Sequence, residues 1–288
     1  MSLAEESYRR NLKEFTKVAK RSFEASINAK GVHAGARRYW ASVLLTRICS
    51  LSASILFICP GSVLNEKGRN WDFESIAALT RSLFEAILVL FYLGLECLPD
   101  DEWYLRFHVV NLADCTERIR IFYELDDHDN VAWGVPTAVL LRARITANPA
   151  FHALPEKLRK ELLTGERPFL LGKREIIKRV GEDPASTLWY YRLLSNYLHF
   201  YPLGFHRTGI HGRDGTENEV DKGNMAVALH FAAKWLNKAV IDFEDQFSDL
   251  VTFGTGSFDF DAMAGRTSSL DARDEALISR VFSSRPQF

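Results

Sequence analysis

The sequence predicts an all-α protein, and three observations support this class. Apolar residues recur at helical spacing through most of the 288 residues. Alternating strand patterns are almost missing, and the turn-like pair Asp214-Gly215 lacks flanking apolar alternation. Helix start and stop signals, such as Asp183-Pro184 and Pro60-Gly61, separate the periodic segments. We therefore expect a multi-helix bundle without a sheet.

The expected helices can be justified in chain order by their periodicity and by the residues at their ends. In chain order they span 4–29, 34–59, 72–98, 101–124, 135–146, 155–163, 173–180, 184–200, 223–248 and 270–282. Pro60-Gly61 ends the second helix, Asp72 can cap the third, and Asp100-Asp101-Glu102 begins the fourth. Pro184 stands at the first position of the eighth, and the Gly254-Thr-Gly-Ser run follows the ninth.

These helices are expected to form one main domain over 1–250. The long helices between 34 and 124 should pack as a bundle that 184–200 and 223–248 complete. Short helices over 135–180 form a predicted insertion that caps one end of this bundle. A polar connection covers 203–222, and a linker with a C-terminal helix covers 251–288.

Composition excludes several classes of protein but leaves the partner open. The chain has 36 Lys and Arg against 37 Asp and Glu, with 47% hydrophobic residues, which excludes wholesale disorder and a highly charged nucleic-acid tail. Four cysteines occur without a CxxC pair, so buried reduced thiols are expected and neither a metal nor a cofactor is predicted. Walker, GxSxG and GxGxxG motifs do not occur, which disfavours NTPase, hydrolase and dinucleotide functions.

The same reading predicts a cytoplasmic protein that does not span a membrane. The first ten residues are polar and charged, unlike the apolar core of a signal peptide. The two most apolar runs, 48–59 and 86–95, contain only 12 and 10 residues. A bilayer span needs about 20 apolar residues, so both runs are expected to be core helices.

A first polar stripe follows the predicted helix 72–98. At about 100° per residue, Arg81, Glu85 and Tyr92 fall within an arc of about 60°, together with Glu74 and Glu96. Arg81 and Glu85 are four residues apart and can pair across one turn. The stripe predicts either a structural ion pair or a polar cleft in which Arg81 or Glu85 contacts a ligand.

A second polar stripe follows the predicted helix 184–200. Arg192, Asn196 and His199 lie on one face, and Arg192 and His199 are two turns apart with a displacement of about 20°. An Arg can stabilise an anionic phosphate, an imidazole can move a proton, and an amide can orient either partner. The alternative is a histidine that caps the negative end of the helix dipole.

Two stretches resemble known helical families. The segments 79–85 (Leu-Thr-Arg-Ser-Leu-Phe-Glu) and 191–199 (Tyr-Arg-Leu-Leu-Ser-Asn-Tyr-Leu-His) are similar to the two landmarks of bacterial all-helical domains of unknown function. The second also resembles the Arg-x4–6-His motif of HEPN domains, which are helical bundles that often act as metal-independent RNases. Leu193 stands where active HEPN nucleases usually carry a polar residue.

The HEPN resemblance implies a function for this stripe. In that superfamily the Arg and His of two protomers meet at a dimer cleft and promote attack of a 2′-hydroxyl on RNA. By motif position, Arg192 would stabilise the phosphate and His199 would act as general base or acid, with Asn196 as the orienting residue. Arg81, Glu85, Tyr92 and His206 would support the site or bind ligand. The implied partners are RNA or a nucleotide and a second copy of the chain.

Other polar segments give weaker signals. Residues 157–179 carry eight Lys or Arg against three Glu, a local charge of +5 that could face RNA phosphates or solvent. The run Asp126-Asp127-His128-Asp129 has donors suited to a metal, but adjacent donors in a turn rarely converge. His206 and His211 bracket a Gly-containing loop, and Cys115 shares a helical face with His108. We expect Cys115 to be a packed thiol.

The leading hypothesis is therefore an all-helical HEPN-like protein that binds or cleaves RNA or a nucleotide without a metal. Two rival hypotheses remain open. In one, the chain is a non-enzymatic interaction module whose polar stripes are structural. In the other, a pocket between helices binds a small molecule.

Overall fold

The computed structural model describes residues 1–32, 35–199, 201, 202, 204, 206, 215–251 and 260. This part of the chain is helical and contains no β-strand, which confirms the predicted all-α class. The predicted helix 270–282, His211 and half of the residues of the 203–222 connection lie outside the described residues. The helices in chain order are α1 (Leu3–Asn28), α2 (Ala36–Ile58), α3 (Phe73–Leu90), η1 (Phe91–Leu95), α4 (Asp100–Glu124), α5 (His128–Ala147), α6 (Pro149–His152), α7 (Glu156–Thr164), α8 (Lys173–Arg179), α9 (Pro184–Leu198) and α11 (Glu219–Phe247).

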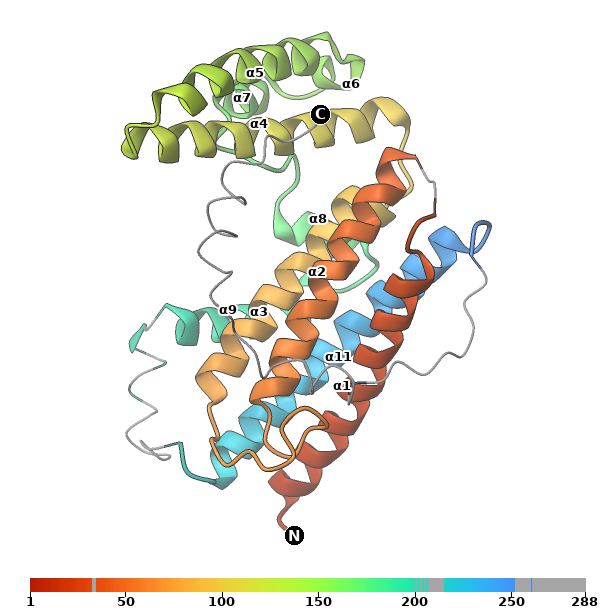
Figure 1. The fold of residues 1–288 in the computed structure, drawn as a ribbon, viewed down its shortest axis with the longest axis vertical. Helices are drawn as coiled ribbons and strands as arrows, with labels where there is room; N and C mark the ends of the chain where they lie inside the picture. Colours follow the sequence, from red (N-terminus) through yellow and green to blue (C-terminus); the bar gives the residue numbers. More distant parts are fainter. Residues whose placement is uncertain are drawn as a thin grey trace.

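A bundle of long helices forms the larger body of the molecule. Figure 1 shows α1, α2, α3 and α11 running side by side along the long axis, with α8 and α9 against them. Their inward faces bury one hydrophobic core, whose largest enclosed side chains include Phe15, Leu45, Phe84 and Trp235. Burial of an apolar side chain of this kind stabilises a fold by about 1.5–3 kcal/mol. Because α9 also packs its apolar side chains into this core, the core fixes the position of α9.

The helices α4 to α7 form a second block across one end of the bundle (Figure 1). This block has its own hydrophobic cluster, which includes Leu112, Ile145 and Leu162. At the α4–α5 crossing, a Cβ on Gly134 would stand 2.6 Å from Ile119, so glycine is needed for this close approach. The expectation that 101–124 belongs to the bundle is not met, because the apolar face of α4 packs against α5.

Helix α5 begins seven residues before the predicted start. Asp127 caps it, accepting a hydrogen bond from the Asn130 amide at 3.1 Å. The Asp126–Asp129 run therefore builds a helix start. Pro136 lies inside the helix, where it removes one backbone hydrogen bond without ending the helix.

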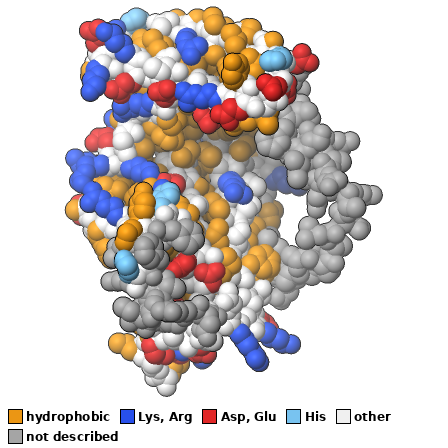
Figure 2. All heavy atoms as spheres, turned by 90° about the vertical axis from the view of Figure 1, so that its left-hand side faces the viewer, with side chains coloured by type: hydrophobic (Ala, Val, Ile, Leu, Met, Phe, Trp, Pro, Cys, Tyr) orange, Lys and Arg blue, Asp and Glu red, His pale blue; other side chains and the backbone are white. Residues whose placement is uncertain are grey.

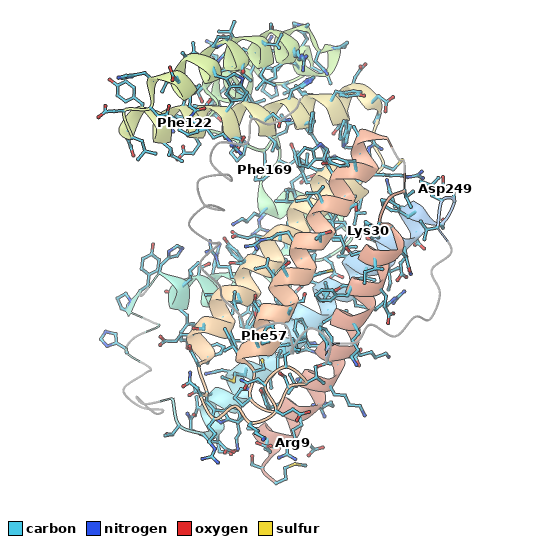
Figure 3. The ribbon with its side chains drawn as sticks, viewed as in Figure 1. Arg9, Lys30, Phe57, Phe122, Phe169 and Asp249 are labelled. Atoms are coloured by element: carbon cyan, nitrogen blue, oxygen red, sulfur yellow. The ribbon has the colours of Figure 1, made fainter. Side chains whose placement is uncertain are left out.

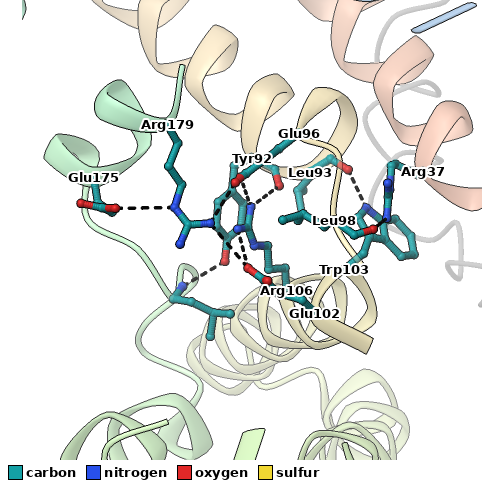
Figure 4. Close-up of polar contacts among 11 residues, drawn as sticks. Arg37, Tyr92, Leu93, Glu96, Leu98, Glu102, Trp103, Arg106, Glu175 and Arg179 are labelled. Atoms are coloured by element: carbon teal, nitrogen blue, oxygen red, sulfur yellow. Dashed lines mark hydrogen bonds and ion pairs between the residues drawn. The ribbon is translucent and has the colours of Figure 1, made fainter. Parts of the chain in front are cut away.

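The two bodies are joined through η1 and a buried arginine (Figure 4). The guanidinium of Arg106, from α4, is fully buried. It donates to the Tyr92 carbonyl at 3.0 Å, to Glu96 at 2.6 Å and to Glu102 at 2.8 Å. Its Cζ also lies 4.4 Å from the centroid of the Tyr92 ring. One cation therefore ties α4 to the end of the α3–η1 helix.

Further contacts close the same joint. Trp103 donates from Nε1 to the Leu93 carbonyl at 2.7 Å, and Arg37 donates to the Leu98 carbonyl at 2.7 Å (Figure 4). Phe169, in the segment that returns from the block to the bundle (Figure 3), packs edge-on against the Tyr92 ring at 5.2 Å. Hydrogen bonds and aromatic packing therefore both hold the α4–α7 block against the bundle at this joint.

Two helices, Ala36–Ile58 and Phe73–Leu95, are long and apolar enough to cross a membrane. The uninterrupted apolar runs on which the sequence prediction rested are shorter than a bilayer span, whereas each whole helix has 23 residues. Within the most apolar window of each, 50% and 61% of the residues are buried inside the protein. The cytoplasmic location stays a prediction.

Candidate functional site

The first polar stripe meets α9 in a cluster formed by Arg81, Glu85, Lys173 and Tyr191, which we call the Tyr191 cluster. The Tyr191 hydroxyl donates to Glu85 Oε1 at 2.7 Å and accepts from Arg81 at 2.9 Å. Lys173, at the start of α8, donates to the same Glu85 oxygen at 2.5 Å and also contacts the Tyr191 hydroxyl. Both cations lie over the Tyr191 ring, Arg81 at 5.1 Å and Lys173 at 4.1 Å. The cluster therefore joins α3, α8 and α9.

The residues of the Tyr191 cluster stabilise one another in their charged forms. Burial raises the pKa of Glu85, but hydrogen bonds from Lys173 and Tyr191 and the Arg81 charge outweigh it, so the pKa is lowered. Burial lowers the pKa of Lys173, but its hydrogen bonds to Glu85 and Tyr191 outweigh that effect and raise it. The Arg81–Glu85 pair, at 3.4 Å, is thus part of a polar network that joins three helices.

We expect Glu85→Gln to lower the free energy of unfolding by about 1 kcal/mol at pH 7, after allowance for the partial exposure of Glu85. Because the folded pKa of Glu85 is lowered, its contribution is present above the pKa of the unfolded chain, about 4.3, and is lost as pH falls through the folded pKa. Urea unfolding from pH 7 to pH 3 should show the two proteins converging. Glu14→Gln, at an exposed position on α1, is the control and should match wild type throughout. A constant gap between wild type and Glu85→Gln would contradict the expectation.

The second polar stripe lies on the outer surface of α9. Arg192 and His199 are both exposed, and Asn196 between them is half-buried. The Asn196 amide donates from Nδ2 to the Arg192 carbonyl at 2.7 Å, and its oxygen is an acceptor that an imidazole could use. His199 is the C-terminal capping residue of α9, and its ring lies 5.6 Å from that of Tyr201. The stripe is open to solvent.

The structure does not bring all the predicted site residues together. Arg192 follows Tyr191, so the two side chains leave α9 about 100° apart and the Tyr191 cluster lies beside the exposed stripe. Tyr92 is buried at the Arg106 joint, where its hydroxyl accepts from the Leu170 amide at 3.0 Å. Tyr92 follows Glu85 by seven residues, about 10 Å along the α3–η1 axis, so the two residues can share a face of the helix without sharing a site. His206 is exposed beyond the end of α9.

Sequence reasoning missed an exposed tryptophan on the same surface. Trp189 is 57% exposed, one turn before Arg192, and Tyr201 beyond the helix end is 54% exposed. Large aromatic residues are usually buried. Because this helix carries apolar residues on most sides, the sequence alone did not show which of them face solvent. Tyr191 was part of the quoted motif, but its role needed the contacts with α3 and α8.

Four of the eight cations in the basic segment 157–179 form ion pairs. Its paired cations are Lys160 with Glu156, Arg167 with Glu161, Lys173 with Glu85, and Arg179 with Glu96. On α8, Arg174 and Lys178 are exposed and have no carboxylate within 4.0 Å among the described residues. Figure 2 views the side of the molecule on which α9 lies, and there Lys, Arg and His side chains lie beside hydrophobic ones below the α4–α7 block.

Two cavities lie elsewhere. One of about 670 Å³ is lined by Tyr8, Arg9, Trp71 and neighbouring residues, and one of about 220 Å³ by Phe91, Cys97 and Arg179 among others. Neither is lined by Arg192 or His199. Within the described ranges, no group of three or more His, Cys, Asp or Glu side chains is placed to hold a metal ion.

Cys115 is a packed thiol, as expected. It is buried and donates to the Gly134 carbonyl at 3.4 Å. Burial, which is the largest effect, and the nearby Asp114 charge raise its pKa, and burial lowers the pKa of His108. Both shifts disfavour the charged thiolate–imidazolium pair that nucleophilic chemistry would use.

Comparison with protein-family models, curated proteins and solved structures gives no match to this chain. The class of protein is therefore defined by the structure itself. It is an all-α protein made of a helical bundle and a capping helical block, with a cationic and aromatic surface on α8 and α9.

Proposed function

We propose that the chain binds single-stranded RNA on the outer surface of α8 and α9. We call this the α8–α9 surface and define it by Arg174, Lys178, Trp189, Arg192 and His199. One observation carries the proposal: an aromatic ring, a cation and an imidazole are jointly exposed along one helix, beside two cations that have no carboxylate partner among the residues the structure describes.

This combination suits a single strand. Cations contact phosphates without reading the sequence, and exposed aromatic rings stack on unpaired bases at about 1–3 kcal/mol each. Trp189 and Arg192 are three residues apart on α9, so a base stacked on the ring would have its phosphate within reach of the guanidinium. The resemblance of 191–199 to the HEPN motif supports the same class of ligand.

Metal-independent cleavage is the second candidate, carried by the exposure of both Arg192 and His199. They are seven residues, about 10 Å, apart along the helix axis, so they could flank one phosphate or contact two successive ones. His199 would take the proton of a 2′-hydroxyl, whose oxygen attacks the adjacent phosphorus. The bond to the 5′-oxygen then breaks and that oxygen takes a proton, leaving a 2′,3′-cyclic phosphate.

Binding is favoured over cleavage for a physical reason. Catalysis gains most from charges arranged in a site that excludes water, whereas these side chains are exposed on a convex helix face. Leu193, where active HEPN nucleases usually carry a polar residue, packs partly buried against the bundle core.

The binding proposal is tested by fluorescence anisotropy with a 20-nucleotide single-stranded RNA in EDTA. We expect Arg192→Gln to weaken binding about 5- to 10-fold and to lower the salt dependence by about one phosphate contact. Trp189→Ala should weaken binding about 10-fold or more through lost stacking. The matched controls Lys13→Gln and Tyr39→Ala, exposed residues on α1 and α2, should bind as wild type does. Equal losses in the controls, or no binding by wild type below about 100 μM, would contradict the proposal and favour the interaction module.

Cleavage is tested in the same buffer. RNA that shortens with 2′,3′-cyclic phosphate ends for wild type but not for His199→Ala would establish the second candidate. Intact RNA with retained binding would leave the chain a binding protein. Shortening that persists in His199→Ala would identify a contaminating nuclease.

A further inference from the structure

The outer face of α5 is apolar although it faces solvent. On the side opposite α4, Val139 is 60% exposed, Leu140 is 51% exposed and Val135 is 48% exposed. Ala132, Pro136, Ala143 and Ala147 continue the same line and are also exposed. The inward face, which includes Ala138, Leu141 and Ile145, already packs against α4 and its neighbours. An apolar helix face of this kind normally packs against another surface.

We propose that a second copy of this chain covers the outer face of α5, with the two α5 helices antiparallel across a two-fold axis. The proposal does not rest on RNA binding, and the α8–α9 surface lies on another part of the molecule (Figure 1). In the arrangement that the HEPN resemblance implies, the Arg and His residues of two protomers meet. An α5 dimer would hold them apart.

The order of residues on α5 is the first argument for a second copy. The middle of the apolar face is symmetric about a point between residues 137 and 138, whereas Ala147 at its end has His128 as its counterpart. Across that point Pro136 pairs with Val139, Val135 pairs with Leu140, and Ala132 pairs with Ala143. A two-fold interface uses the same patch on both subunits and therefore requires such self-complementarity. Small residues at both ends of the face let two helix backbones approach closely.

The charges at the two ends of α5 are the second argument. Asp129 lies on the same outward line at the N-terminal end. Arg144, at the C-terminal end, lies about 100° round the helix from Ala143, at the edge of the face, and its charge also acts on His108 of α4. Neither forms an ion pair within 4.0 Å in the part of the chain that the structure describes. Antiparallel pairing places the acidic end of one helix near the basic end of the other and opposes the two helix dipoles favourably.

The surface extends beyond the helix itself. Tyr123 and Leu125, at the turn from α4 into α5, are 70% and 66% exposed. In an antiparallel pair, this turn lies near the partner's C-terminal end of α5, which ends in small residues. Tyr123 and Leu125 thus add exposed apolar side chains next to the N-terminal end of α5, and a stable dimer buries about 800 Å² per partner.

The first test measures oligomeric state by light scattering and sedimentation at 5–100 μM, a range of roughly 20-fold chosen to bracket micromolar affinities. We expect a dimer for wild type and a monomer for Val139→Glu at the lower concentrations, with a dissociation constant raised at least about 100-fold because two carboxylates would be buried per dimer. Val227→Glu, at an exposed valine on α11, is the matched control and should stay dimeric. Leu140→Lys is a second disrupting variant, and circular dichroism checks that each variant is folded. A monomeric wild type, or a dimeric Val139→Glu, would overturn the proposal.

The second test measures geometry by cysteine crosslinking in a Cys97→Ser background, since Cys97 is exposed whereas Cys49, Cys59 and Cys115 are buried. Pro136 is the outward residue nearest the proposed axis, so Pro136→Cys should form a disulfide-linked dimer on oxidation. Ala147→Cys is the control, because its two copies would be about 28 Å apart. Crosslinking at 147 but not at 136 would overturn the antiparallel arrangement even if the protein is dimeric.

Discussion

Replacing Arg106 with alanine is expected to lower the free energy of unfolding by about 3–5 kcal/mol, close to the loss seen when one partner of a buried ion pair is removed. Arg106 is fully buried and is held by Glu96, Glu102, the Tyr92 carbonyl and the Tyr92 ring. The truncation would leave two carboxylates beside the joint and an empty space the size of a guanidinium. Guanidinium chloride unfolding, followed by circular dichroism, measures the loss.

Arg179→Ala is the matched control for Arg106→Ala. Arg179 contacts the same two carboxylates, with Glu96 at 2.8 Å and Glu102 at 3.6 Å, but about a third of its side chain is exposed. Exposed ion pairs contribute about 0–1 kcal/mol, so this variant should stay within about 1 kcal/mol of wild type. Similar losses in the two variants would show that burial of Arg106 does not determine the effect.

The effect of Arg106 should also depend on pH. Burial raises the pKa of Glu96, but hydrogen bonds from Arg106 and Arg179 outweigh burial and lower it. Stability from this group is therefore present above the unfolded pKa of about 4.3 and is lost as pH falls through the folded pKa. The stability gap between wild type and Arg106→Ala should shrink between pH 6 and pH 3, a window of about 3 units that contains this unfolded pKa. A gap that widens on acidification would contradict this assignment.

Replacing Trp235 with alanine should cost about 3–5 kcal/mol, the range for truncating a buried aromatic residue. Trp235, on α11, is 1% exposed and packs against Phe84 of α3 at 4.8 Å between ring centroids. Phe84 in turn contacts Tyr191 of α9 at 5.9 Å. The variant therefore removes the packing that holds the Tyr191 cluster and the α8–α9 surface in place.

Trp189→Ala is a control of the same residue type for Trp235→Ala. Because Trp189 is exposed on α9, its truncation should change the free energy of unfolding by about 0.5 kcal/mol or less. Thermal and denaturant unfolding of both variants measures the difference. The two variants should therefore differ in what they lose. Trp235→Ala should lose free energy of unfolding, and Trp189→Ala should lose RNA affinity alone. A large stability loss in Trp189→Ala would contradict the exposed position of this side chain.

Much of the helical pattern could be predicted from the sequence because helix boundaries depend on local signals. Asp183-Pro184 and Asp72 begin helices as predicted, since a capping carboxylate acts within three residues of its own position. Helix α5 shows the limit of that reasoning. The predicted start at 135 is seven residues late, and packing of Ala138 and Ile145 against α4 outweighs the hydrogen bond that Pro136 removes.

The candidate site could be predicted in part. Arg192, Asn196 and His199 share one helix, so their common face followed from a regular period. Tyr92 lies about two turns beyond Glu85 and is buried against Arg106 of α4, and the period of one helix does not show which neighbour covers each turn. The partners of Glu85 come from α8 and α9, about 90–105 residues further along the chain, and no local pattern connects residues at such separations.

By itself the sequence determined that this chain is helical, where most helices begin and end, and that two of them carry polar stripes. Those properties depend on backbone hydrogen bonds and capping groups within a few residues. Only the tertiary structure decided that α4 leaves the bundle, that Arg106 is buried, that Trp189 faces solvent and that the outer face of α5 stays uncovered. Those outcomes depend on which apolar faces meet, and that choice is made by burial across the whole molecule.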